Sequence, residues 1–333
     1  MRGSGKKVGT VVLTIFSLVT VLLVVLRTVI ANKYIEAGTG FYVGGKSFIL
    51  AFNIILVAFV VAIVAYSLIK LRKKHLNVRP DGRAMGIASL IITAGFIYDV
   101  YSSMTIFSTS KACHHFISLF SSERTETTNI VVDILQGYML FIGAFLALLS
   151  VIYFVIMALC CLGGSGDYSK HSLLALAPVW WCIFRAVYFI LIPMNFPRIS
   201  DMLYELIMVG FMLLFFSAFA RVASRVDGEN SVSKVISYGM CAAVFAAISS
   251  VPRLVAKLMG AKGVVYTSPQ DVEEVVFRSD YCFMALAVFV FCAVFVFYAV
   301  KKISYGNAYL EGAQEEKELL ELEERDRKLS GLE

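Results

Sequence analysis

Eight apolar segments alternate with short polar segments along this chain. Each is close to the ~20 residues that a helix needs to cross the hydrocarbon core of a bilayer. Consecutive helices joined by short polar connections return across the same membrane, and an even number of spans places both chain ends on one side. The pattern predicts an all-α, polytopic transmembrane helical bundle over 1–302, with eight spans at about 9–31, 47–69, 85–107, 137–161, 172–194, 200–220, 235–256 and 281–300.

The composition supports the membrane class. Of 333 residues, 59% are hydrophobic and only 16% are charged, whereas soluble domains have about 45–50% apolar and about 25% charged residues. The net charge of +6 is modest, and its basic residues gather in a few connecting segments. We interpret this charge as a topology signal. The partner it predicts is the lipid bilayer, and it does not predict nucleic-acid binding.

Three basic segments agree on an orientation. Segment 70–83 carries six basic residues and one acidic residue, further basic residues lie in 221–234, and Lys301 and Lys302 follow the last span. With the N-terminus, all fall on one side when the spans alternate. By the positive-inside rule that side is the cytoplasm. We therefore predict a multi-pass cell-membrane protein with both termini cytoplasmic (N-in/C-in).

The first apolar segment has two interpretations. Val29-Ile-Ala31 offers the small residues of a signal-peptide cleavage site. The apolar run is long for a signal peptide, however, and Arg27 lies just before that site. We favour a retained helix, and cleavage would leave the rest of the topology unchanged.

Arg185 is the residue whose placement in the predicted membrane costs the most free energy. It lies about 13 residues, or ~20 Å, from the cytoplasmic end of the fifth span, and its guanidinium stays charged at any biological pH. A charge at the bilayer centre costs at least ~2.5–3.5 kcal/mol without compensation. Arg185 therefore needs a partner or water.

Two acidic residues are predicted at a similar depth. Asp99 of the third span lies at nearly the same height, and Glu205 of the sixth span lies about 16 residues, or ~24 Å, from its cytoplasmic end. One arginine with two candidate acids leaves one acid without an obvious cation, and burial would favour its neutral form. Four further polar residues are predicted at the outer rim of this region: Asn53, Asp133, Gln136 and Asp201.

Two interpretations of this outer-half polar region stay open. In the first, Arg185 pairs with Asp99, or else with Glu205, and the ion pair fixes how the helices pack. In the second, Arg185 binds an anionic ligand, or a carboxylate takes up a proton. An ionisable residue inside a membrane is by default a candidate functional residue, but an ion pair alone does not identify a pathway.

The connecting segments contain few candidate functional residues. His114 and His115 are adjacent and therefore do not face the same way on a regular element, so we predict surface histidines and no metal site. Cys113 and Cys282 both fall near the predicted outer face, where a disulfide between them is one alternative. Metal-binding, phosphate-binding and nucleophile motifs are absent from the sequence, which predicts a protein that is not an enzyme and holds no cofactor.

The segment 303–333 differs from the rest of the chain. It is rich in glutamate and basic residues at helical i,i+4 spacing, which predicts a charged cytoplasmic helical tail. It is either a solvated helix or, over 311–333, a docking helix for a cytoplasmic protein partner or for self-association.

Two functions follow from these features. The first is a permease or transporter-like protein with an unknown small ligand at the polar region around Arg185, Asp99 and Glu205, for which a small anion would suit the arginine. The alternative is a non-catalytic membrane sensor or scaffold that recruits a partner through its C-terminal helix.

Overall fold

The computed structural model describes residues 4–34, 42, 44–67, 69, 82–109, 131–163, 168–191, 199–224, 231–258 and 283–301. Within these ranges all regular secondary structure is helical, and there are no β-strands. Eight of the described helices are long and apolar enough to cross a membrane. The predicted all-α bundle of eight spans is thereby confirmed, while the side of the membrane at which the termini lie stays a prediction. The predicted tail after residue 302 lies outside the described residues.

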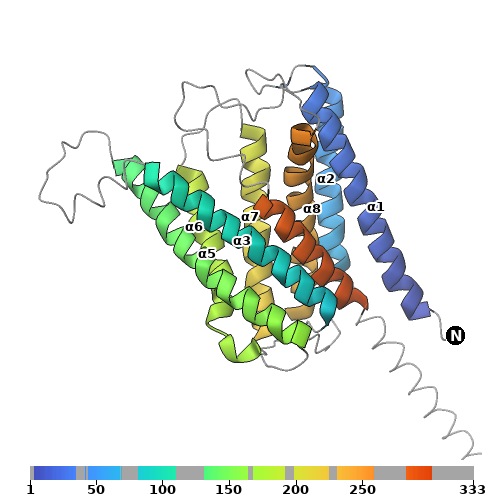
Figure 1. Cartoon of the computed structure of the whole chain (residues 1–333). Coiled ribbons are helices and arrows are strands. Elements are labelled where there is room, and N and C mark those ends of the chain that lie inside the picture. The colour runs from blue at the N-terminus through green and yellow to red at the C-terminus, as the bar shows by residue number, and fades with distance from the viewer. Residues whose placement is uncertain are drawn as a thin grey trace, which may run out of the picture.

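The helices follow the apolar segments in order (Figure 1). We call the face of the bundle where α1 begins the N-terminal side, and the face where α1 ends the opposite side. The bounds are α1 (Ser4–Lys33), α2 (Lys46–Tyr66), α3 (Arg83–Thr109), α5 (Val131–Gly163), α6 (Ala177–Leu191), α7 (Ile199–Ala223) and α8 (Ser231–Leu258), followed by the C-terminal membrane helix Phe283–Lys301.

Two helices start in a way that the predicted spans do not show. The fifth span starts with the short 3-10 turns η2 (Tyr168–His171) and η3 (Leu174–Leu176), and regular α-helix begins only at Ala177. Pro178 explains this start, because proline has no N–H to donate and is tolerated only in the first turn of a helix. The fourth span starts at Gly137 as predicted, but its helix α5 already begins at Val131, so that Asp133 and Gln136 lie in the first turns of α5, before the span.

Helix α8 is the centre of the bundle. In its most apolar window 89% of the residues are buried, and it packs against α7, α1 and α2. Small residues every four positions, such as Gly239 and Ala243, allow this close packing. A Cβ at Gly239 would lie 3.0 Å from the Phe215 ring and 3.1 Å from Val296. The stripe therefore faces neighbouring helices of the same chain.

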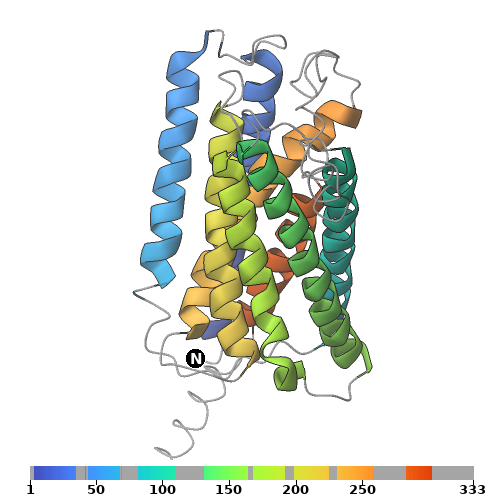
Figure 2. The same ribbon diagram turned by 90° about the vertical axis from the view of Figure 1, so that its left-hand side faces the viewer.

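Helices α1 and α2 form the edge of the molecule. Only 17% of the α2 window and 33% of the α1 window are buried, and α2 stands at the margin of the bundle (Figure 2). The exposed residues of α2 are large and apolar, including Leu50, Ile54 and Val57. A helix face of this composition is suited to contact with lipid acyl chains.

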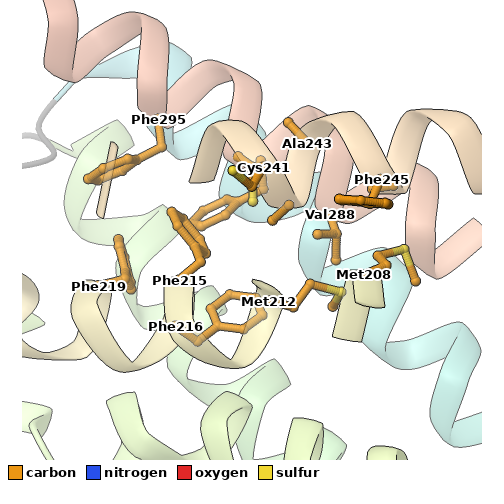
Figure 3. Packing of buried hydrophobic residues seen from close by; sticks show 14 of the residues in the cluster. Met208, Met212, Phe215, Phe216, Phe219, Cys241, Ala243, Phe245, Val288 and Phe295 are labelled. Atoms are coloured by element: carbon orange, nitrogen blue, oxygen red, sulfur yellow. The ribbon is translucent and has the colours of Figure 1, made fainter. Parts of the chain in front are cut away.

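An aromatic cluster fills the half of the core nearer the N-terminal side. Phe215 and Phe219 of α7 meet Phe295 of the C-terminal membrane helix, and Phe216 packs beside Phe215 (Figure 3). The Phe215 and Phe295 rings lie edge to face with centroids 5.8 Å apart, a favoured aromatic geometry. Phe215 is ten residues, or ~15 Å, along α7 from Glu205, so this apolar cluster underlies the polar residues described next.

Candidate functional site: a buried polar layer

Buried charged residues concentrate near the opposite side of the bundle. Arg27 lies six residues before the end of α1, Glu205 six residues after the start of α7, and Arg253 five residues before the end of α8. Together with residues of three other helices they form what we call the polar layer: Arg27, Asn53, Asp99, Arg185, Tyr204, Glu205 and Arg253. All five charged members are at most 7% exposed.

Asp99 and Arg185 form an ion pair between α3 and α6. The Nη2 of Arg185 donates to Oδ1 of Asp99, and the indole Nε1 of Trp181 donates to Oδ2 of the same carboxylate at 2.8 Å. Each carboxylate oxygen of Asp99 therefore has its own donor. The two donors come from one face of α6, because Trp181 and Arg185 are four residues apart on a helix.

Aromatic rings surround this ion pair. The guanidinium carbon of Arg185 lies 5.9 Å from the ring centroid of Trp181 and 5.9 Å from that of Tyr188, within the range of a cation–π interaction. Phe96, one turn before Asp99 on α3, meets Trp181 edge to face at 5.0 Å. These rings exclude water and hold the guanidinium in place, which strengthens each of its electrostatic interactions.

Glu205 has a different partner from those considered in the sequence. It forms an ion pair with Arg253 of α8, while Arg185 pairs with Asp99. Neither carboxylate oxygen of Glu205 has a hydrogen bond among the described residues. The contact with Arg253 is thus a charge contact without a well-aligned hydrogen bond. Arg253 directly follows Pro252, which lies inside α8 and removes one backbone hydrogen bond from it.

Tyr204 joins the edge helices to the core. Its hydroxyl donates to Oδ1 of Asn53 on α2 at 2.6 Å, and the guanidinium carbon of Arg27 on α1 lies 4.9 Å from its ring centroid. Arg27 also donates to the hydroxyl of Tyr42 at 3.2 Å. Because Tyr204 precedes Glu205, adjacent residues of α7 hold α1 and α2 on one flank and α8 on another.

Sequence reasoning placed part of this layer and missed the rest. Depth along the helices put Asp99 beside Arg185, and the structure brings them together. Arg253 falls near the end of the predicted span 235–256 and Arg27 beside the possible cleavage site, and the sequence placed neither in the polar region. Counting back from the opposite-side ends of α7 and α8 would have put Glu205 and Arg253 at one level.

The remaining predicted positions contribute less to the site. Asn53 takes part through Tyr204. The side chains of Asp133, Gln136 and Asp201 lie outside the described residues, as do Cys113, Cys282, His114 and His115. Among the residues that the structure does describe, no group of three histidine, cysteine or acidic side chains could hold a metal ion.

The geometry allows two kinds of chemistry in the polar layer. Arg185 presents a guanidinium to a planar carboxylate inside an aromatic enclosure, which is the arrangement that proteins use to recognise carboxylates. The second is ion pairing between helices, because Asp99 and Glu205 are buried acids that each contact an arginine of another helix.

The eight apolar helices define a multi-pass membrane protein. No protein-family model, curated protein or solved structure matches the chain. Its activity must therefore be argued from the polar layer itself.

Proposed function

We propose that this protein is a permease-like transporter of a small solute and that the polar layer is its solute site. The observation that carries the proposal is the gathering of charged residues from five helices, α1, α3, α6, α7 and α8, at one level of the bundle. Packing alone does not require so many charges.

The energetic argument rests on the cost of these charges. Removing two ions from water costs several kcal/mol for each ion, and apolar residues of similar volume often replace a buried ion pair without loss of stability. Two such pairs in one layer are thus expensive for a bundle that needs only to fold. Charged residues inside membranes characteristically mark solute and ion pathways.

The position of the layer also suits a transporter. It lies near one side of the bundle, above the aromatic cluster around Phe215, so solute entering from the opposite side would reach charged residues before the closed apolar part of the core. In transporters, solute sites are commonly built from charged side chains and interrupted helices in the membrane. Pro252 interrupts the hydrogen bonding of α8 next to Arg253.

Flux through reconstituted protein tests the proposal. Proteoliposomes would be mixed with isosmotic solutions of sodium formate, acetate, lactate or chloride, or of glycerol, neutral sugars or amino acids. Their swelling would be followed by light scattering. We expect wild-type protein to equilibrate at least one solute faster than empty liposomes. Arg185→Gln should abolish that flux, because the polar layer then loses the guanidinium that pairs with Asp99.

A matched arginine provides the control. Arg221 is exposed in the last turn of α7, away from the polar layer, and Arg221→Gln should keep wild-type flux. The proposal is wrong if wild-type protein moves none of these solutes faster than empty liposomes, or if folded Arg185→Gln protein moves them at the wild-type rate.

The scaffold alternative depends on 303–333, which lies outside the described residues. It stays a prediction, checked by deleting 311–333 and measuring whether a partner captured by the full chain is lost.

A further inference from the structure

The Arg185–Asp99 pair shows what kind of solute would fit. A carboxylate already lies against the guanidinium of Arg185, between the rings of Trp181 and Tyr188. Any small molecule that takes the place of Asp99 on Arg185 must supply the same planar pair of oxygens. The site is thus already shaped for a carboxylate, and Asp99 occupies it in the resting structure.

Such an exchange must leave the net charge of the buried site unchanged. If a solute carboxylate takes Arg185, Asp99 is left as a buried anion, 4% exposed. A buried charge without its partner is strongly destabilising, and the group avoids this cost by taking up a proton. The exchange therefore brings in one anion and one proton, and the net charge of the site does not change.

Among the side chains that the structure describes, no other charge near Asp99 could replace the proton. Helix α6 packs against α5, α7 and η3; α5 has Asp133 as its only charged residue, and η3 has none. Of the charged residues on α7, Glu205 is paired with Arg253, Arg221 lies at the N-terminal side, and the side chain of Asp201 lies outside the described residues. The C-terminal membrane helix carries only Lys301, at its end. The titratable groups that the described residues place near the pair are the thiols of Cys182 and Cys292 and the phenol of Tyr188.

The hydrogen bond from Trp181 remains usable throughout. The indole N–H can donate to Oδ2 of Asp99 when the acid is charged, and to its carbonyl oxygen when Oδ1 carries the proton. Protonated Asp99 also lies on the same helix face as the buried Ser102 and Ser103, whose hydroxyls can accept from it.

From these features we infer that Arg185 binds a small carboxylate together with one proton: the carboxylate replaces Asp99 on Arg185, and a proton from the aqueous phase moves onto Asp99. This inference rests on the proposed function for its role in transport, but the binding event it describes can be measured without flux.

Trp181 supplies the signal for that measurement. The chain has two tryptophans, Trp180 and Trp181; Trp180 is 52% exposed and Trp181 is fully buried against Asp99. In Trp180→Phe protein, the remaining fluorescence reports on the indole bonded to Asp99. Formate, acetate and lactate would be added to purified protein in weakly buffered detergent solution, with chloride and sulfate at matched ionic strength as comparators.

We expect a saturable fluorescence change with at least one carboxylate, accompanied by uptake of one proton for each anion bound, read with a pH-indicator dye. Because binding and protonation are linked, the half-saturating concentration should fall by up to about tenfold for each unit decrease in pH. Asp99→Asn should keep the fluorescence change but lose both the proton uptake and the pH dependence.

Two results would overturn the inference. One is carboxylate binding by wild-type protein without proton uptake, which needs no variant to observe. The other is the absence of a response to any of the three carboxylates at pH 5.5 and at pH 7.5. If such protein nevertheless transports a neutral solute in the swelling assay, the proposed function stands and only the carboxylate–proton inference fails. If the protein binds a carboxylate with proton uptake but shows no flux, the carboxylate–proton inference stands and the proposed function fails.

Discussion

Two buried ion pairs lie in the same layer of this bundle and differ in how well each is satisfied. In the Asp99–Arg185 pair, both carboxylate oxygens have a donor, one from Arg185 and one from Trp181. In the Glu205–Arg253 pair, neither carboxylate oxygen has a hydrogen bond among the described residues, although the charges are in contact. Both acids are almost completely buried, so their desolvation costs are similar.

The difference indicates two kinds of site. Arg185 and Trp181 lie four residues apart on one helix, and aromatic rings hold both, so α6 presents a rigid pair of donors to one carboxylate. Arg253 follows Pro252 near the end of α8, where the helix has lost a hydrogen bond. We interpret the first pair as a preorganised carboxylate site and the second as a charge balance between α7 and α8.

Breaking either pair by one substitution should have the largest effect on stability. Arg185→Gln leaves Asp99 buried without its cation, and we expect a loss of about 3–5 kcal/mol in the free energy of unfolding. The double variant Asp99→Asn/Arg185→Gln removes both charges and should recover most of that loss. The measurement is SDS-induced unfolding in mixed micelles, with Arg221→Gln as an exposed arginine control.

The same double-mutant cycle on Glu205 and Arg253 sharpens the comparison. Because this pair lacks an aligned hydrogen bond, its coupling free energy should be smaller by about 1.5 kcal/mol or more, the worth of a hydrogen bond to a charged group. Equal coupling free energies in the two cycles would contradict the distinction between the two sites.

Depth and composition were enough to predict the first pair but not the second. Each apolar run fixes the ends of its helix to within a few residues, so Asp99 and Arg185 could be placed at one height. Arg253 was left out of the predicted polar region because it lies only about three residues from the end of its predicted span, where a long basic side chain can reach the membrane interface. Which acid pairs with which arginine depends on the packing of α6 against α3 and of α7 against α8, and no periodicity encodes those choices.

The contribution of Tyr204 was equally hidden from the sequence. Its ring lies against Arg27, which is about 177 residues earlier in the chain, and its hydroxyl bonds to Asn53. An isolated tyrosine near a helix end is usual at a membrane interface, so its sequence context gives no reason to choose it. Only the helix arrangement shows that it connects α1 and α2 to the core.

Trp181→Phe tests the donor that distinguishes the first pair. The change removes the 2.8 Å hydrogen bond to Asp99 and keeps an aromatic ring, so we expect a loss of about 2–3 kcal/mol, the upper range for a hydrogen bond to a charged group. Trp180→Phe is the matched control, because Trp180 is exposed on the lipid-facing surface and should change stability by less than about 0.5 kcal/mol. A similar loss in both variants would show that Trp181 acts through its bulk alone.

Gly95→Ala tests the close packing that holds Asp99 in place. A Cβ at Gly95, one turn before Asp99, would lie 2.6 Å from the Cβ of Ala287. Helix α3 and the C-terminal membrane helix would have to separate, at a cost of about 1–3 kcal/mol. Gly143→Ala is the control, since nothing lies within 4 Å of its Cβ position, and alanine there should stabilise α5 by up to about 1 kcal/mol. Thermal unfolding in detergent measures both variants.

Ser67→Ala should have the smallest effect and tests whether the two sides of the bundle are independent. Ser67 at the end of α2 donates to the backbone carbonyl of Ser233 at 2.7 Å, and Ser233 donates back to the carbonyl of Ser67 at 2.9 Å. Losing one of these neutral bonds should cost about 1 kcal/mol.

Ser233 lies twenty residues, or ~30 Å, from Arg253 along α8, so the cost of Ser67→Ala should add to that of Arg253→Gln within about 0.5 kcal/mol. Unfolding free energies of the two single variants and the double variant decide this. A larger coupling would mean that α8 transmits strain along its whole length. The contact of α2 with α8 and the Glu205–Arg253 pair would then belong to one element that shifts as a unit, and the second ion pair could not be treated as a local charge balance.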